Sequence, residues 1–278
     1  MLSAVPGSNS KKRSEPDGAS ENSDDLANND VFMAICALKE NYFPAAKMSK
    51  RRRSASINST SSEEKPILKF IIRHVLYTYF SDRSYVDQQC EWLRLNKAIR
   101  VLSLGNEVLL CVNDDYLLYA KATLLEFEED SLERIAVSLL VYEILPNNFN
   151  ALISESAILD FGKSWPKNAK RTLPSVFLAL GFTNIQREGI YGWSLPGNSG
   201  SFLLETLSGR KEILGKLNRN RDGRMREAAF LSSKLTRSSF SLDWHLRDLV
   251  GGGFVRLTET AGGRMITIGS KFRRKSTT

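Results

Sequence analysis

Cysteine and histidine are scarce in this chain, which has three cysteines and two histidines among 278 residues. Cys36, Cys90 and Cys111 lie far apart and none belongs to a Cys-x-x-Cys pair, so neither a disulfide framework nor a zinc site is indicated. His74 and His245 alone cannot form a multi-histidine metal centre. We therefore expect no metal and no other cofactor, although a catalytic site made of carboxylates is not excluded.

Long apolar runs are also missing. No stretch approaches the roughly 20 apolar residues that span a bilayer, and residues 1–16 are polar and basic, without the apolar block of a secretory signal. We expect a soluble protein on the cytosolic or nuclear side, with no membrane partner and no small-molecule substrate. With 42% hydrophobic residues, the chain can bury a substantial core spread over one to three modest domains.

Residues 1–65 contain few apolar side chains outside one short stretch. Ser, Asn, Asp, Lys and Pro dominate residues 3–30 and 47–65, and such segments cannot bury enough apolar area to offset the entropy of ordering. We expect a mostly disordered region with one helix near residues 30–43 that docks on the folded part. The apolar residues that recur there at helical spacing are Phe32, Ile35, Leu38 and Tyr42.

Inside this region lies a basic run made of Lys50, Arg51, Arg52 and Arg53. Two interpretations stay open: a solvated charge run, or a nuclear import signal beside a site for a basophilic kinase. In the second interpretation Ser54 and Ser56 are the phosphorylated residues, and phosphate there would offset the neighbouring positive charge. The segment would then act as an electrostatic switch.

Residues 66–128 show two helical patterns followed by two β-like runs. The two runs meet at Gly105-Asn106, a pair that favours a tight hairpin turn. Helix, helix and hairpin in that order describe a winged helix. The expected elements are a helix over 67–79, a helix that Ser84 opens with Asp87 as its capping-box partner, strands over 99–104 and 107–112, and a connecting helix over 114–128.

The same order recurs in residues 129–197 and in residues 198–268, at uneven spacing, which argues for repeated architecture rather than duplicated sequence. We predict an α+β, mainly helical protein with three tandem winged-helix domains after the N-terminal region, and a basic tail over 269–278. The second unit is expected to hold helices over 132–145 and 172–180, a short segment over 154–159, and a hairpin over 184–187 and 191–195. The third is expected to hold helices over 201–217, 225–235 and 241–250 and a hairpin over 254–258 and 265–268.

Particular residues, most of them in the first and third units, also match a known family. In the first unit they are Asp82, Arg83, Ser84, Asp87, Gln89, Ile99, Arg100, Val101, Leu104 and Gly105. Further along they are Trp193, Pro196, Gly197, Gly200, Phe202, Gly209, Arg210, Asp248, Leu249 and Gly251. Through them, residues 66–268 resemble the serine/threonine-protein kinase 19 family. The Ser-rich insertion over 44–65 and the tail beyond Ile268 depart from the family pattern.

The resemblance implies a nuclear protein of three tandem winged-helix domains that binds double-stranded DNA and serves transcription-coupled nucleotide-excision repair. The family name suggests a kinase instead. Asp160-Phe161-Gly162 spells the metal-binding tripeptide of protein kinases, and His245-Leu246-Arg247-Asp248 echoes their catalytic loop, but the two stand in the reverse of the kinase order. A glycine-rich phosphate loop and a strand lysine are missing too. We therefore predict no enzyme, and we place His245 on the outer side of its helix.

Positive charge is concentrated in residues 205–278, which hold 16 Lys and Arg against 7 Asp and Glu in a chain of net charge +8. Such an excess attracts polyanions, which favours duplex DNA as the partner. We expect the chain to grip phosphates with little base readout, because the predicted helix over 241–250 exposes Asp243 and Asp248 and these acids would repel phosphates. The candidate DNA-binding residues are Arg210, Lys211, Lys216, Arg219, Arg221, Arg224, Arg226, Lys234 and Arg237, and Arg247, Arg256 and Arg264 extend this surface.

Two further hypotheses concern protein partners. The acidic run over 126–130 precedes the middle unit and makes that unit the best candidate for binding repair or transcription proteins. Alternatively, the whole chain is a scaffold whose basic face binds an acidic protein segment.

Overall fold

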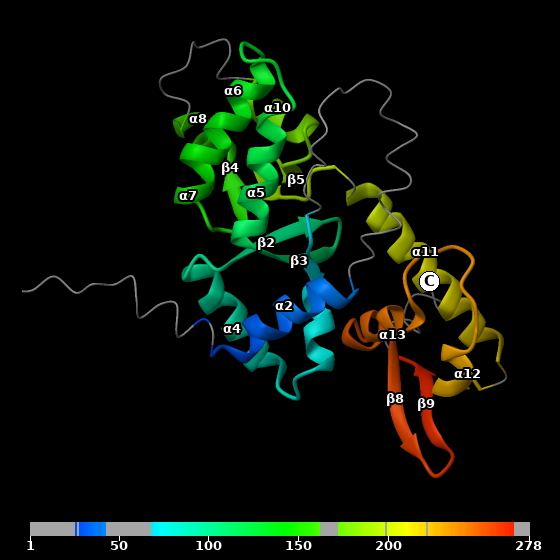
Figure 1. Cartoon of the computed structure of the whole chain (residues 1–278). Helices are drawn as coiled ribbons and strands as arrows, with labels where there is room; N and C mark the ends of the chain where they lie inside the picture. Colours follow the sequence, from blue (N-terminus) through cyan, green and yellow to red (C-terminus); the bar gives the residue numbers. More distant parts are fainter. Residues whose placement is uncertain are drawn as a thin grey trace, which may run out of the picture.

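The protein is an α+β structure with three small antiparallel sheets, shown in Figure 1 as a computed structural model. The residues described are Leu26, 28–42, 68–161, 172–197, 199–220 and 222–269. Several predictions fall outside them: the basic run over 50–53, Ser54, Ser56, Arg221, and the tail from residue 270 onward. In the part of the chain that is described, no helix has the length and apolar character needed to cross a membrane.

The three sheets share one strand order. In each sheet the strand that comes last in the chain lies in the middle, paired on both sides, in the orders β1-β3-β2, β4-β6-β5 and β7-β9-β8. The strands are β1 (Ile71–Ile72), β2 (Ile99–Leu104), β3 (Glu107–Val112), β4 (Leu152–Ser154), β5 (Thr183–Arg187), β6 (Ile190–Trp193), β7 (Arg224–Arg226), β8 (Val255–Thr260) and β9 (Gly263–Ile268). All three predicted hairpins are confirmed, and the first has the predicted bounds.

The first unit begins with the N-terminal helix. Helix α2 (Asp30–Tyr42) confirms the helix expected near 30–43, and its Val31, Ile35 and Leu38 pack with Val86 and Cys90 of the next long helix in one buried cluster. The elements that follow α2 are β1, the 3-10 helix η1 (Arg73–Thr78), α4 (Arg83–Leu95), β2 and β3. Helix α2 is therefore an integral part of this unit.

The helix expected over 67–79 is wrong in its first half and is present only as the 3-10 helix η1 in its second. Ile71 and Ile72 instead pair with Leu110 and Leu109 of β3, because the sheet offers their backbone groups partners that local sequence does not reveal. The start of α4 also differs slightly from the prediction. Asp82 is its N-cap, and its carboxylate accepts a hydrogen bond from the Ser84 backbone N–H at 2.8 Å.

The second unit is mostly helical around a short sheet. The predicted helix over 132–145 is present as three successive pieces, with a π-helical turn in the middle. Helix α5 (Asn113–Leu124) is the predicted connecting helix, and the helices of the second unit are α6 (Leu132–Leu139), η2 (Leu140–Ile144), α7 (Leu145–Asn147), α8 (Glu155–Phe161) and α10 (Leu173–Ala179). Pro174 lies in the first turn of α10, where its missing N–H costs nothing.

The third unit contains α11 (Ser199–Arg219), β7, α12 (Glu227–Leu231), α13 (Leu242–Gly251), β8 and β9. The helix expected over 225–235 is wrong at its start, because residues 224–226 form β7 and pair with β9. Polar and apolar residues alternate in Arg224, Met225 and Arg226, and this alternation is the sequence pattern that indicates a strand here. Figure 1 shows the β8–β9 hairpin projecting from the body of the molecule.

A single hydrophobic cluster continues through all three units. It includes Phe70 beside β1, Phe177 on α10 and Trp244 on α13. Phe202 of α11 lies between the first and third units, with its ring centroid 4.6 Å from that of Phe70 and 6.0 Å from that of Trp244. The three units therefore pack against one another through a shared hydrophobic core.

Arg100 joins the first unit to the second. Its side chain is buried and donates to Asn113 Oδ1 at 2.8 Å and to the Asn148 carbonyl at 3.0 Å, and a further hydrogen bond goes to the Leu145 carbonyl. Those two carbonyls lie at the C-terminal end of the α6–η2–α7 helix, where a cation is favourable. Burial lowers the pKa of Arg100 to about 10, and the guanidinium remains charged at neutral pH.

Candidate nucleic-acid interface

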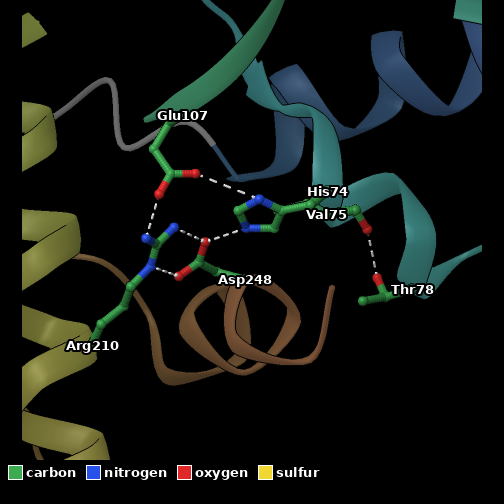
Figure 2. Close-up of polar contacts among 6 residues, drawn as sticks. All are labelled: His74, Val75, Thr78, Glu107, Arg210 and Asp248. Atoms are coloured by element: carbon green, nitrogen blue, oxygen red, sulfur yellow. Dashed lines mark hydrogen bonds and ion pairs between the residues drawn. The ribbon is translucent and has the colours of Figure 1, made fainter. Parts of the chain in front are cut away.

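A network of four ionisable side chains joins the third unit to the first (Figure 2). Arg210 on α11 donates through Nε and Nη2 to the two Asp248 oxygens, both at 2.6 Å, and through Nη1 to Glu107 Oε1 at 2.5 Å. His74 on η1 approaches the same two carboxylates, with Nε2 2.8 Å from Asp248 Oδ1 and Nδ1 3.5 Å from Glu107 Oε2. Two basic groups therefore face two acids in a closed ring.

The network is largely shielded from solvent. Asp248 is fully buried and Arg210 is 5% exposed. Burial acts to raise the pKa of Asp248, but hydrogen bonds from Arg210 and His74 outweigh it and hold that pKa below its ordinary value. Burial likewise acts to lower the pKa of Arg210, and the hydrogen bonds to Asp248 and Glu107 reverse the effect and raise it.

Two sequence predictions are wrong at this network. Arg210 was expected to bind DNA, but its guanidinium is held by Asp248 and Glu107 and is not available to a phosphate. Asp248 was expected on an exposed helix face, but it is buried under the first unit. The residues that cause both outcomes, His74 and Glu107, lie more than a hundred positions away, and local charge counting could not find them.

Two glycines allow close packing around α13, Gly251 against the first unit and Gly209 against the His245 ring. A Cβ on Gly251 would lie 2.0 Å from the His74 carbonyl oxygen, and a Cβ on Gly209 would lie 2.2 Å from the His245 ring. Helix α13 therefore packs directly on η1, and six of its residues are buried: Trp244, His245, Leu246, Asp248, Leu249 and Gly251. Helix α13 is therefore largely buried between the first unit and the rest of the third.

His245 is also placed differently from the prediction. It is fully buried rather than on the outer side of α13, and its Nε2 lies 2.8 Å from Ser238 Oγ. Among the described residues its Nδ1 has no hydrogen-bond partner. Burial is the main cause that lowers the pKa of His245 to about 4, so the ring is neutral at physiological pH.

An exposed basic face lies on the third sheet. Arg224 and Arg256 both pair with Thr267, so they occupy one row across the three strands, and Arg226 occupies the next row with Met265 and Thr258. Because alternate residues of a strand point to the same side, the three arginines share one face. We call this the basic sheet face, defined by Arg224, Arg226 and Arg256.

The opposite side of the same sheet is apolar and packs inward. Ile266 and Ile268 of β9 are buried there with Phe230 of α12 and Leu249 of α13. The alternation of polar and apolar residues thus directs the arginines to solvent, and all three are exposed. Within the described residues, none of the three forms an ion pair.

The remaining basic candidates divide into exposed and engaged groups. Four are exposed: Lys211, Arg219, Lys234 and Arg237. Lys216 is engaged, because its Nζ lies 3.0 Å from Glu212 Oε1 and also donates to the Lys234 carbonyl. Burial acts to raise the pKa of Glu212, but Lys216 and the Thr236 and Arg237 backbone N–H groups lower it to about 2. This carboxylate therefore stays charged and holds the loop before α13 against α11.

The fold and this surface define an α+β protein with three sheets of one strand order and an exposed arginine face on the last. No family model matches the chain. The chain is similar to "Winged helix repair factor 1" of Xenopus laevis, with 22% identity over 210 residues that cover 71% of this chain and 74% of that protein. The name of that relative describes it as a winged-helix protein and a repair factor.

Proposed function

We propose that this chain is a nuclear protein of three tandem winged-helix domains that binds duplex DNA and acts in repair. The observation that carries the proposal is the basic sheet face, where three arginines are exposed on one side of a sheet without an ion-pair partner among the described residues. Guanidinium groups on a rigid scaffold suit phosphate oxygens. Without a bound anion, these like charges would repel one another.

The domain assignment rests on an order of elements that occurs three times: helix, strand, helix, helix, strand, strand. The first domain contains α2, β1, η1, α4, β2 and β3; the second contains the α6–η2–α7 helix, β4, α8, α10, β5 and β6; the third contains α11, β7, α12, α13, β8 and β9. With α2 included, the first domain begins near residue 30 rather than at residue 66. The similarity to a winged-helix relative supports this assignment.

Binding through the sheet face would recognise the DNA backbone more than its bases. Helix α13, the helix that precedes the hairpin of the third domain, is packed on the first domain, so a phosphate-gripping mode fits better than insertion of that helix. Arg219, in the last turn of α11, and Lys211 can add further backbone contacts. We expect strong dependence on salt and little preference for sequence.

Repair is the process that the relative's name favours. The resemblance to the serine/threonine-protein kinase 19 family narrows this to transcription-coupled nucleotide-excision repair, with repair or transcription proteins as partners, and to a nuclear location.

We propose no kinase activity, because the kinase-like segments have structural roles. Phe161 ends α8 and packs against the core, and Asp248 is held in the buried network. We expect no phosphoryl transfer from ATP by the purified protein. Transfer that persists in the Asp160→Ala variant would point to a contaminating kinase. Transfer by the wild type that the Asp160→Ala variant lacks would contradict this part of the proposal.

The DNA proposal is tested by charge reversal on the sheet face. Fluorescence anisotropy with a short random duplex across a salt series should give steep salt dependence for the wild type. Arg224→Glu/Arg256→Glu should bind at least about tenfold more weakly, and its log–log salt slope should fall by about 2, since each lost phosphate contact removes about 0.9.

The matched control is Lys121→Glu/Arg187→Glu, which makes the same change in net charge at exposed residues of α5 and β5. It should retain most of the affinity. If both double variants lose affinity equally, only net charge matters and the sheet face is not the site. If the wild type shows no salt-sensitive binding, the DNA proposal fails and the scaffold hypothesis takes its place.

A further inference from the structure

The second domain has an apolar helix face that the fold does not use. The α6–η2–α7 helix runs without a break from Leu132 to Asn147. Its inward residues Ala136, Val137 and Leu140 belong to the main core. Its outward side carries other apolar residues, so this helix is apolar on two sides.

The outward residues form a stripe at helical spacing. They are Leu132, Ile135, Tyr142 and Pro146, which we call the α6 stripe; Leu139, which stands between Ile135 and Tyr142 at the same spacing, is buried in the main core. The first three have exposed fractions of 36%, 43% and 62%. Scattered exposed apolar residues need no explanation, but apolar residues aligned along one helix face are typical of a protein-docking surface.

Charge around the stripe is strongly negative. Residues 126–143 contain six acids and a single base, Arg134, in a chain whose net charge is +8. Arg134 itself lies 3.9 Å from Glu129, so it is partly neutralised. Glu133 and Glu143 are on the same helix as the stripe. The face therefore combines apolar anchor sites with an acidic border.

This combination excludes several occupants. DNA phosphates would be repelled, and a second copy of the same face would bring like charges together. The chain's own segment over 44–65 has the complementary charge in its basic run but only Met48 and Ile57 as large apolar residues, too few to cover the stripe. Charge and apolar content together fit an amphipathic helix with Lys and Arg beside its apolar face.

We propose that the α6 stripe binds a basic amphipathic helix of a partner protein. This site lies at the opposite end of the molecule from the β8–β9 hairpin (Figure 1), and it does not depend on the DNA proposal. Protein and DNA could therefore be bound at the same time.

The test uses a defined probe on the full-length protein. A fluorescein-labelled helical peptide of about five turns carries Leu at i, i+3 and i+7 on one face and Lys or Arg elsewhere. Two control peptides are a scramble of the same composition and a version with Glu in place of Lys and Arg. Anisotropy is measured at about 0.15 M salt, where weak surface attraction is screened.

The matching protein variants are Ile135→Ser/Tyr142→Ser and, as control, Leu204→Ser/Leu207→Ser on α11, where the two leucines are also exposed. We expect the amphipathic peptide to bind the wild type and the control, and to bind the stripe variant at least about tenfold more weakly. Circular dichroism checks that each variant remains folded. Glu133→Lys/Glu143→Lys should weaken binding as well.

Three results would overturn the proposal. Equal binding of the scramble means that charge alone attracts the peptide, and unchanged binding to the stripe variant places it elsewhere. Absence of binding by the wild type refutes this partner chemistry. Sedimentation supplies one more check, because a dimer that Ile135→Ser/Tyr142→Ser dissociates would show that a second copy covers the stripe instead.

Discussion

Asp248→Asn replaces one carboxylate oxygen by an amide nitrogen, and we expect it to lower the stability of the fold strongly. The carboxylate accepts two hydrogen bonds from Arg210 and one from His74, and its side chain is fully buried. An amide in its place presents N–H groups to those donors and leaves the Arg210 charge with only Glu107 as a partner. Breaking a buried ion pair from one side costs about 3–5 kcal/mol, a large part of a typical total stability of roughly 5–15 kcal/mol.

The measurement is urea-induced unfolding followed by tryptophan fluorescence, since Trp244 lies on the same helix as Asp248. Asp243→Asn is the control, because its ion pair with Arg247 at 3.1 Å is half-exposed and worth less than about 1 kcal/mol. Removing both charges with Arg210→Met/Asp248→Leu should recover part of the loss, since no buried Arg210 charge is then left without Asp248, while Glu107 keeps His74 at 3.5 Å as its neighbour. If Asp248→Asn unfolds within about 1 kcal/mol of the wild type, the network does not hold the first and third units together as argued.

Two other predictions concern residues of helix α13. Gly251→Ala should destabilise the protein by at least about 2 kcal/mol, because the new Cβ would meet the His74 carbonyl oxygen at 2.0 Å. The control Gly253→Asn should cost less, since Gly253 has φ +73 and open space around it. Equal urea midpoints for the two variants would contradict this packing. Protonation of His245 should destabilise the protein as the pH is lowered. Its folded pKa of about 4 is below the ordinary 6.5, so the unfolded chain binds the proton more readily. The free energy of unfolding should therefore decrease from about pH 7 to pH 4, by up to about 3 kcal/mol. Unfolding at pH 7 and 5 should show a smaller change for His245→Gln than for the wild type, and identical changes would refute this assignment.

Prediction from the sequence succeeded where interactions between neighbouring residues determine the structure. The Gly105-Asn106 turn and the runs beside it predicted the first hairpin with its bounds, because a turn residue with positive φ and apolar strands act over a few neighbours. Ser241 is the N-cap of α13 and its side chain accepts the Trp244 N–H, so the predicted start lies within one residue of the observed one. The short strands β1, β4 and β7 were missed, since two or three residues carry too little pattern and their partners lie far along the chain.

The candidate site divides in the same way. The sequence alone determined that positive charge gathers in the last quarter of the chain, because composition is a property of the chain itself. It could not distinguish Arg210 from Arg224, which lie only 14 positions apart. Tertiary structure decided that Arg210 meets Glu107, 103 positions away, and is buried, while Arg224 faces solvent across the sheet from Arg256. A charge becomes a structural ion pair or a binding residue according to the neighbours that folding brings to it, and those neighbours are not local in sequence.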